Sequence, residues 1–165
     1  MSTKRVSDYA RFFEDDDDVV HRLLETWEPG APGQSEKNYE AALYGWLTHN
    51  LQDVPMTAQY GIAKAKADIV VEDRHVIELK LGFRNASDLN RCIGQLETYR
   101  SKWVDPSRGP VFLVLVGDSD PEFRAALYRW FCKTSAELFQ TWFYICEIRS
   151  DVKGAKRFWR PAAEV

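Results

Sequence analysis

The chain has 165 residues, of which 45% are hydrophobic and 28% charged, and its formal net charge is −3. This length suits one domain with a substantial core, and the mixture is typical of a globular protein rather than a disordered or fibrous one. The sequence contains no apolar run long enough to span a membrane and no signal peptide. The three cysteines (Cys92, Cys132 and Cys146) are far apart, which argues against a disulfide framework, a zinc ribbon or an iron–sulfur cluster and predicts a cytoplasmic protein.

The first third of the chain is acidic, and the remainder is weakly basic. Residues 1–60 hold 5 Lys or Arg against 11 Asp or Glu, whereas residues 61–165 hold 17 against 14. We therefore expect a polyanionic partner to bind the later part of the chain more readily than the first part.

The N-terminal segment has the pattern of a helical extension. Apolar residues recur at helical spacing over residues 6–28, and an acidic run at 14–18 divides them into two helices. A linker rich in Pro and Gly follows at 28–36. We therefore expect a helical extension over 1–30 and a separate domain over 31–165.

The second part of the chain alternates helix and strand. The hydrophobic pattern predicts, in chain order, helix 36–51, strand 56–62, a hairpin over 67–81, helix 85–103, strand 111–116, a helix starting at 120 and strand 141–148. Ser35, Ser87 and Asp120 are the expected N-terminal caps of the three helices. This order predicts a mixed α/β sandwich, with a central sheet flanked by helices.

The hairpin carries charged residues where a sheet usually carries apolar or neutral ones. Side chains alternate along a strand, so Val76, Glu78 and Lys80 share one face of the second hairpin strand, and the apolar residues between them share the other. We expect the apolar set to pack on the core helices and the charged set to face a cleft or solvent.

The register of the hairpin would bring two carboxylates together. If Val71 pairs with His75 across the turn, Asp68 lies opposite Glu78, with the side chains roughly 5 Å apart on one face. Two such carboxylates repel unless a cation lies between them. Mg²⁺ prefers oxygen ligands and uses one or two carboxylates with water and phosphate oxygens, so the pattern indicates metal-assisted attack on a phosphodiester, with Lys80 orienting a water or a phosphate oxygen.

These residues resemble the motif of the PD-(D/E)XK nuclease superfamily, the restriction-endonuclease-like fold. Glu40 on the first helix of the domain, Asp68 on the second strand and Glu78-Leu79-Lys80 on the third occur in the family's order. The next helix carries Gln95-Leu-Glu-Thr-Tyr99, which is similar to the Q-x-x-x-Y signature of the RecB-like branch. The resemblance covers about residues 36–116 and implies an αβββαβ core with an added N-terminal helical segment. Ala67 stands where the family often has proline.

The resemblance also implies roles for these residues. Asp68, Glu78 and the backbone carbonyl of Leu79 would hold Mg²⁺, for which Mn²⁺ is expected to substitute, and Glu40 would complete the metal site or remain a solvated helix-border residue. Lys80 would position the attacking water. Gln95 and Tyr99 would support the site or contact phosphate, although a tyrosine at that position can also be mainly a core residue.

Basic residues near the hairpin are candidates for nucleic-acid contacts. Lys64 and Lys66 either contact a backbone phosphate or form a solvated strand connection, and Arg84 and Arg91 are expected to contact nucleic acid at the start of helix 85–103. The segment 153–160 combines basic and aromatic residues and would either stack on single-stranded bases or pack on the domain. A second D-x-K triplet at 151–153 lies in a predicted turn and is interpreted as coincidental.

The sequence therefore predicts a cytoplasmic, Mg²⁺-dependent nuclease that hydrolyses phosphodiester bonds, with DNA favoured over RNA as its partner. Two alternatives stay open: a catalytically inactive module of the same fold that binds nucleic acid or a protein, since fold does not imply activity, and a ribonuclease. A homodimer is also left open, and no membrane association is expected.

Overall fold

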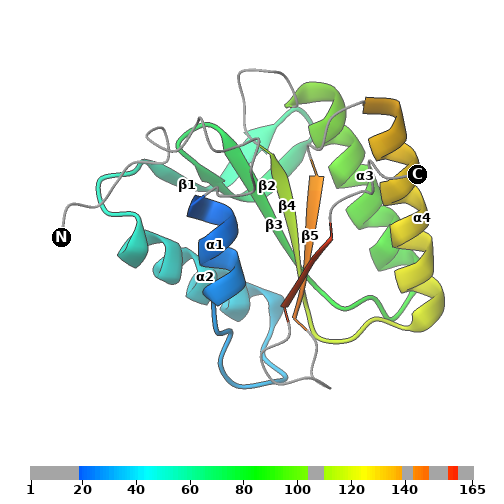
Figure 1. The fold of residues 1–165 in the computed structure, drawn as a ribbon, viewed down its shortest axis with the longest axis horizontal. Coiled ribbons are helices and arrows are strands. Elements are labelled where there is room, and N and C mark those ends of the chain that lie inside the picture. The colour runs from blue at the N-terminus through cyan, green and yellow to red at the C-terminus, as the bar shows by residue number, and fades with distance from the viewer. Residues whose placement is uncertain (1–18, 104–109, 139–142, 149–155, 160–165) are drawn as a thin grey trace.

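The described part of the chain folds into four helices and six strands in the computed structural model (Figure 1). The structure describes residues 19–103, 110–138, 143–148 and 156–159. Its elements, in chain order, are α1 (Val19–Thr26), α2 (Glu36–Asn50), β1 (Met56–Ile62), β2 (Ala65–Val71), β3 (His75–Leu81), α3 (Ala86–Lys102), β4 (Val111–Val116), α4 (Pro121–Leu138), β5 (Phe143–Ile148) and β6 (Lys156–Trp159).

The strands form one mixed sheet in the order β1-β2-β3-β4-β5-β6. Strands β3, β4 and β5 run parallel to one another, whereas β1 and β2 form an antiparallel pair and β2 is antiparallel to β3. The five predicted strands are confirmed. The short strand β6, which the sequence pattern did not predict, pairs antiparallel with β5 and extends the sheet at that edge. An α/β fold with a mixed open sheet is therefore established.

Helices cover both faces of the sheet (Figure 1). On one face, α1 and α2 pack on a cluster that includes Leu43, Leu47, Ile77, Leu79 and Phe112. On the other face, α3 and α4 pack on a cluster that includes Val76, Leu96, Leu113, Leu127 and Phe131. Every residue of β4 is buried, as its continuous apolar run predicted for a strand covered on both faces.

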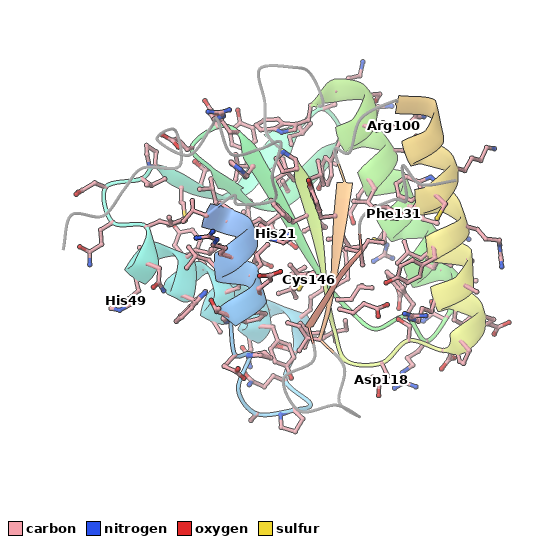
Figure 2. All side chains as sticks on the ribbon, in the orientation of Figure 1. His21, His49, Arg100, Asp118, Phe131 and Cys146 are labelled. Atoms are coloured by element: carbon pink, nitrogen blue, oxygen red, sulfur yellow. The ribbon has the colours of Figure 1, made fainter. Side chains whose placement is uncertain are left out.

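The described part of the N-terminal segment shares the core of the domain. Val20 and Leu24 of α1 are buried in the same cluster as the sheet residues. His21 of the same helix is labelled in Figure 2, and its ring meets that of Tyr144 of β5 edge-on at a centroid distance of 5.6 Å. The indole nitrogen of Trp46 on α2 also donates a hydrogen bond to the Leu23 carbonyl at 2.9 Å. Helix α1 is thus packed against α2 and the sheet.

The helix caps follow the expected chemistry, with one correction. Ser35 caps α2 and accepts a hydrogen bond from the backbone N–H of Asn38. The predicted cap of α3 at Ser87 is wrong, because Asn85 takes this position in an extended conformation and accepts from the N–H of Asp88. Asn and Ser are about equally good caps, so the sequence pattern could not separate them.

Several expectations concern residues outside those described, namely the first part of the predicted N-terminal helices and the D-x-K triplet at 151–153. Within the described ranges, no helix is both long enough and apolar enough to cross a membrane. All three cysteines are free thiols, and Cys92 and Cys146 are buried.

Candidate active site

The β2–β3 hairpin has the predicted register. Val71 pairs with His75, and the ladder continues as far as Ile69 and Ile77. Pairing ends there, one step before Asp68, although the register still places Asp68 level with Glu78.

The carboxylate of Asp68 takes the place of the next ladder bond. Its Oδ2 accepts a hydrogen bond of 2.8 Å from the backbone N–H of Leu79. This bond holds the Asp68 carboxylate against the β3 backbone, between the positions that carry Glu78 and Lys80. The residue Asp68 has an exposed fraction of only 7%, so its carboxylate is largely removed from water.

Glu78 lies deeper than the sequence pattern predicted. We expected the charged face of β3 to line a cleft or solvent, but α3 covers this face and Glu78 has an exposed fraction of 0%. The hydroxyl of Tyr99 on α3 donates a 2.8 Å hydrogen bond to Glu78 Oε2, and Lys80 Nζ lies 3.0 Å from Glu78 Oε1. Burial of a charge is tolerated only with such partners, and both partners are among the predicted site residues.

Burial and mutual repulsion shift the protonation of the two carboxylates. Burial and the negative charge of Glu78 raise the pKa of Asp68 from its ordinary 3.8 to about 7, against the opposing effect of the Leu79 N–H. Burial likewise raises the pKa of Glu78, although Lys80 and the Tyr99 hydroxyl oppose this. The hydrogen bonds of the cluster thus offset only part of the cost of ionising both carboxyl groups.

Lys80 remains an ammonium group in this environment. Burial alone would lower the pKa of Lys80, but the charges of Glu78 and Glu36 outweigh burial and raise it. Its Nζ lies 3.5 Å from Oε1 of Glu36 on α2, and Oε2 of Glu36 accepts a 3.4 Å hydrogen bond from the backbone N–H of Leu81. Lys80 is thus fixed between two carboxylates, and it acts as a positive charge and hydrogen-bond donor rather than as a base.

Sequence reasoning missed Glu36. An acidic residue in the first turn of a helix has a sufficient local explanation in the helix dipole, so its pairing with Lys80 became evident only from the packing of α2 beside the end of β3. The capping pattern around Ser35 does fix where α2 begins, which is the one local signal that places Glu36 at that end of the helix.

Glu40 approaches the cluster only through a second missed residue, Gln59 on β1. The Gln59 side-chain nitrogen donates to Glu40 Oε1 at 2.6 Å and lies 3.4 Å from Asp68 Oδ1. Among the residues that the structure describes, no three His, Cys, Asp or Glu side chains lie close enough to hold one metal ion together. The three predicted carboxylates therefore do not converge directly in this conformation.

The two α3 residues of the Q-x-x-x-Y pattern differ in their contacts. Besides donating to Glu78, the Tyr99 hydroxyl oxygen lies 3.1 Å from the Lys66 carbonyl oxygen, which can share its single proton. This contact places α3 beside β2. Gln95 lies one turn earlier on the same side of the helix, and its buried Oε1 accepts no hydrogen bond from the described residues. Tyr99 is thus brought into the site, whereas Gln95 is placed beside it without a contact to the carboxylates.

The predicted nucleic-acid residues all lie at the surface. Lys64 and Lys66 are exposed at and just after the β1–β2 turn, and Arg91 is exposed on α3. Arg84 precedes α3, is also exposed, and lies 3.3 Å from a carboxylate oxygen of Asp120. These side chains are accessible to a polyanion, with Arg84 already engaged by one carboxylate.

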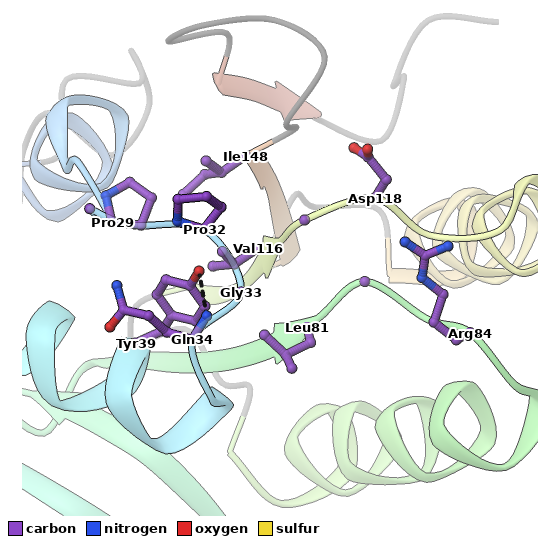
Figure 3. Close-up of a pocket in the computed structure, with 13 residues that line it drawn as sticks. Pro29, Pro32, Gly33, Gln34, Tyr39, Leu81, Arg84, Val116, Asp118 and Ile148 are labelled. Atoms are coloured by element: carbon purple, nitrogen blue, oxygen red, sulfur yellow. Dashed lines mark hydrogen bonds between the residues drawn. The ribbon is translucent and has the colours of Figure 1, made fainter.

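A pocket of about 430 Å³ lies at the carboxyl ends of the parallel strands, and Asp68, Glu78 and Lys80 are not among its lining residues. Leu81, which follows Lys80, and Val116 contribute apolar lining, and Figure 3 shows Pro29 and Pro32 at one end of the pocket and Arg84 at the other. Crevices at the carboxyl ends of parallel strands commonly bind ligands. The pocket therefore provides an accessible space at the end of β3, outside the charged cluster itself.

Two carboxylates of the cluster, rather than three, are placed where they could bind a divalent cation. Asp68 and Glu78 supply hard oxygen atoms at neighbouring positions of adjacent strands. The buried Oε1 of Glu78 accepts no aligned hydrogen bond from the residues that the structure describes, although Lys80 is close. Two carboxylates with water or phosphate oxygens suffice for Mg²⁺. The fold and the site thus define an α/β protein with a buried carboxylate–lysine cluster on its central hairpin.

Comparison with known proteins adds nothing to this description. No protein-family model, no curated protein and no solved structure matches the chain. Inference about its activity therefore depends on the residues and geometry of the cluster.

Proposed function

We propose that this protein is a metal-dependent nuclease of the PD-(D/E)XK type that hydrolyses phosphodiester bonds, with DNA as its substrate. The observation that carries the proposal is the grouping of Asp68, Glu78 and Lys80. The pKa of the Asp68 carboxyl group is raised to about 7. Glu78 is fully buried, and the Lys80 ammonium lies 3.0 Å from it. This arrangement of charges is costly for folding. Such clusters of shifted pKa values are typical of functional sites.

Each residue has a distinct role in this proposal. Asp68, Glu78 and the Leu79 carbonyl would hold Mg²⁺, which when bound would lower the pKa of a coordinated water and offset charge in the transition state. The Leu79 N–H keeps the Asp68 carboxylate in place. Lys80 donates hydrogen bonds to the attacking water or to a phosphate oxygen, and its fixed ammonium adds positive charge where negative charge develops.

Two further residues hold these groups in position. The Tyr99 hydroxyl orients Glu78 through its 2.8 Å hydrogen bond, and Glu36 holds Lys80 from the opposite side. The exposed Lys64, Lys66, Arg84 and Arg91 would contact backbone phosphates on either side of the scissile bond, and the pocket beside Leu81 would receive part of the bound strand.

A catalytically inactive binding module of the same fold is the second candidate. It is favoured by the pairing of charges within the cluster, since Lys80 already contacts both Glu36 and Glu78 and the Gln59 amide bridges toward Glu40 and Asp68. A module of this kind would bind DNA or RNA without cleaving it.

Cleavage of matched DNA and RNA oligonucleotides in the presence of Mg²⁺ tests the proposal. We expect the unsubstituted protein to cut DNA, and Lys80→Ala and Asp68→Ala to lose cleavage while keeping the circular dichroism spectrum of a folded α/β protein. Lys37→Ala, which removes an exposed lysine of α2, is the matched control and should cut at the original rate. An unchanged rate in either site variant would remove the mechanism, and cleavage of RNA alone would identify a ribonuclease.

A further inference from the structure

Gln59 has an unusual backbone conformation at the point where β1 meets the site. Its two neighbours on β1 pair with the two neighbours of Asp68 on β2, so Gln59 lies level with Asp68 across the ladder. Its φ angle is 54°, in the left-handed region that a long side chain rarely adopts. Strain of this kind persists only where surrounding contacts fix it, and it often marks a functional position.

The side chain of Gln59 supplies those contacts. Its Nε2 donates to Glu40 Oε1 at 2.6 Å and lies 3.4 Å from Asp68 Oδ1. Only the nitrogen of the amide can face two carboxylates favourably, because its oxygen would be repelled by them. One neutral donor thus lies between two acidic groups that come from α2 and β2.

The amide compensates these carboxylates only in part. A neutral hydrogen-bond donor satisfies lone pairs but brings no net positive charge, and the charge of Glu40 is one of the influences that keep the pKa of Asp68 raised. A divalent cation would supply both ligand bonds and charge. Gln59 is also exposed, so its side chain can move into solvent without disturbing the core.

We propose that the Gln59 amide competes with a divalent cation for the carboxylates of Glu40 and Asp68, and that it must withdraw when the metal binds. This inference rests on the proposed function, because it requires a cation at Asp68. It explains why Glu40 does not join the other carboxylates directly in this structure: the amide of Gln59 binds it instead. Gln59 would then set how tightly the protein holds its metal.

Titration calorimetry with Mn²⁺ at pH 8, on the full chain, tests this inference. Gln59→Ala removes the competing donor, so we expect it to bind Mn²⁺ about tenfold more tightly than the unsubstituted protein, as loss of one hydrogen bond to a charged group implies. Gln59→Asn keeps an amide that is one methylene shorter and suits the left-handed backbone, and it should show a smaller gain in affinity. Gln52→Ala, at an exposed glutamine in the turn after α2, should bind like the unsubstituted protein.

A second measurement separates competition from simple support of the site. In metal-free buffer at pH 8, Gln59→Ala should unfold at a lower urea concentration than the unsubstituted protein, because the two carboxylates lose their shared donor, whereas Gln52→Ala should not. Mn²⁺ affinity that is equal or weaker in Gln59→Ala, while the unsubstituted protein binds the ion, would overturn the inference and leave the proposed function standing. Failure of the unsubstituted protein to bind Mn²⁺ would overturn both.

Discussion

The substitution Asp68→Asn should make the metal-free protein more stable at pH 8 while abolishing cleavage. Asp68 is almost fully buried, and its ionised form is disfavoured by burial and by Glu78, which place its pKa at about 7 instead of 3.8. A carboxyl group with a raised pKa in the folded state binds its proton more tightly there than in the unfolded state. The free energy of unfolding therefore falls as the pH rises from about 4 to about 7, and the full cost is present above that range.

The structure sets the size of this effect. Each pH unit between the two pKa values corresponds to ~1.4 kcal/mol, so ionisation of Asp68 costs the folded state up to ~4 kcal/mol at pH 8. An asparagine in its place still accepts the Leu79 N–H through its side-chain oxygen, but a hydrogen bond to a neutral acceptor is weaker by ~1 kcal/mol. We expect a net gain of up to about 3 kcal/mol, the difference between these two effects, which is large against the typical 5–15 kcal/mol stability of a domain.

Urea unfolding in buffer with a chelator, at pH 8 and at pH 4.5, measures the gain. The free energy of unfolding of Asp68→Asn should exceed that of the unsubstituted protein by about 3 kcal/mol at pH 8. The difference should be much smaller at pH 4.5, where the folded state of the unsubstituted protein already carries a proton on Asp68. Asp73→Asn is the matched control, since Asp73 is exposed in the turn of the same hairpin, and it should change stability by less than about 0.5 kcal/mol. A loss of stability at pH 8, or an equal gain at both pH values, would refute the reasoning.

Three further substitutions test other contacts of the site. Tyr99→Phe removes the donor to buried Glu78 and should lower the free energy of unfolding by about 1–3 kcal/mol in urea titrations; a loss below about 0.5 kcal/mol would show that the bond contributes little. Glu36→Gln weakens the hold on Lys80 and should slow single-turnover DNA cleavage about tenfold without changing Mn²⁺ affinity, whereas an unaltered rate would remove Glu36 from the site. Arg84→Ala should weaken DNA binding and reduce by about 1 the slope of log affinity against log salt concentration, as fluorescence anisotropy would show; an unchanged slope would mean that Arg84 contacts no phosphate.

Local pattern was sufficient to predict five of the strands and the hairpin of β2 and β3, but not the short edge strand β6. Alternation along β3 and the short turn after Val71 fixed the register with His75, because a shift by one residue would turn the apolar side chains of the strand away from the core. The same alternation placed Glu78 and Lys80 on one face. It could not show that α3 covers this face, since the covering helix lies elsewhere in the chain, and Glu78 is therefore more deeply buried than predicted.

The residues that sequence reasoning missed depend on contacts distant in the chain. Glu36 contacts Lys80, which lies 44 residues later in the chain. Gln59 has a left-handed φ angle that its residue type does not predict. The resemblance to the nuclease superfamily, by contrast, implies a site role for Glu40 on the helix before the hairpin. Among the described residues, Gln59 links Glu40 to Asp68. Short-range pattern thus identified the charged groups, whereas tertiary packing decided which of them touch.

The most direct test of the account is an anomalous-difference map from a crystal of the protein soaked with Mn²⁺ at pH 8. The account predicts a single strong peak within coordination distance of Asp68 and Glu78, with Lys80 beside it, and the Gln59 side chain turned away. A well-ordered crystal that shows no peak at these carboxylates, or a peak only at other surface carboxylates, would contradict the claim that Asp68 and Glu78 hold the metal of a nuclease.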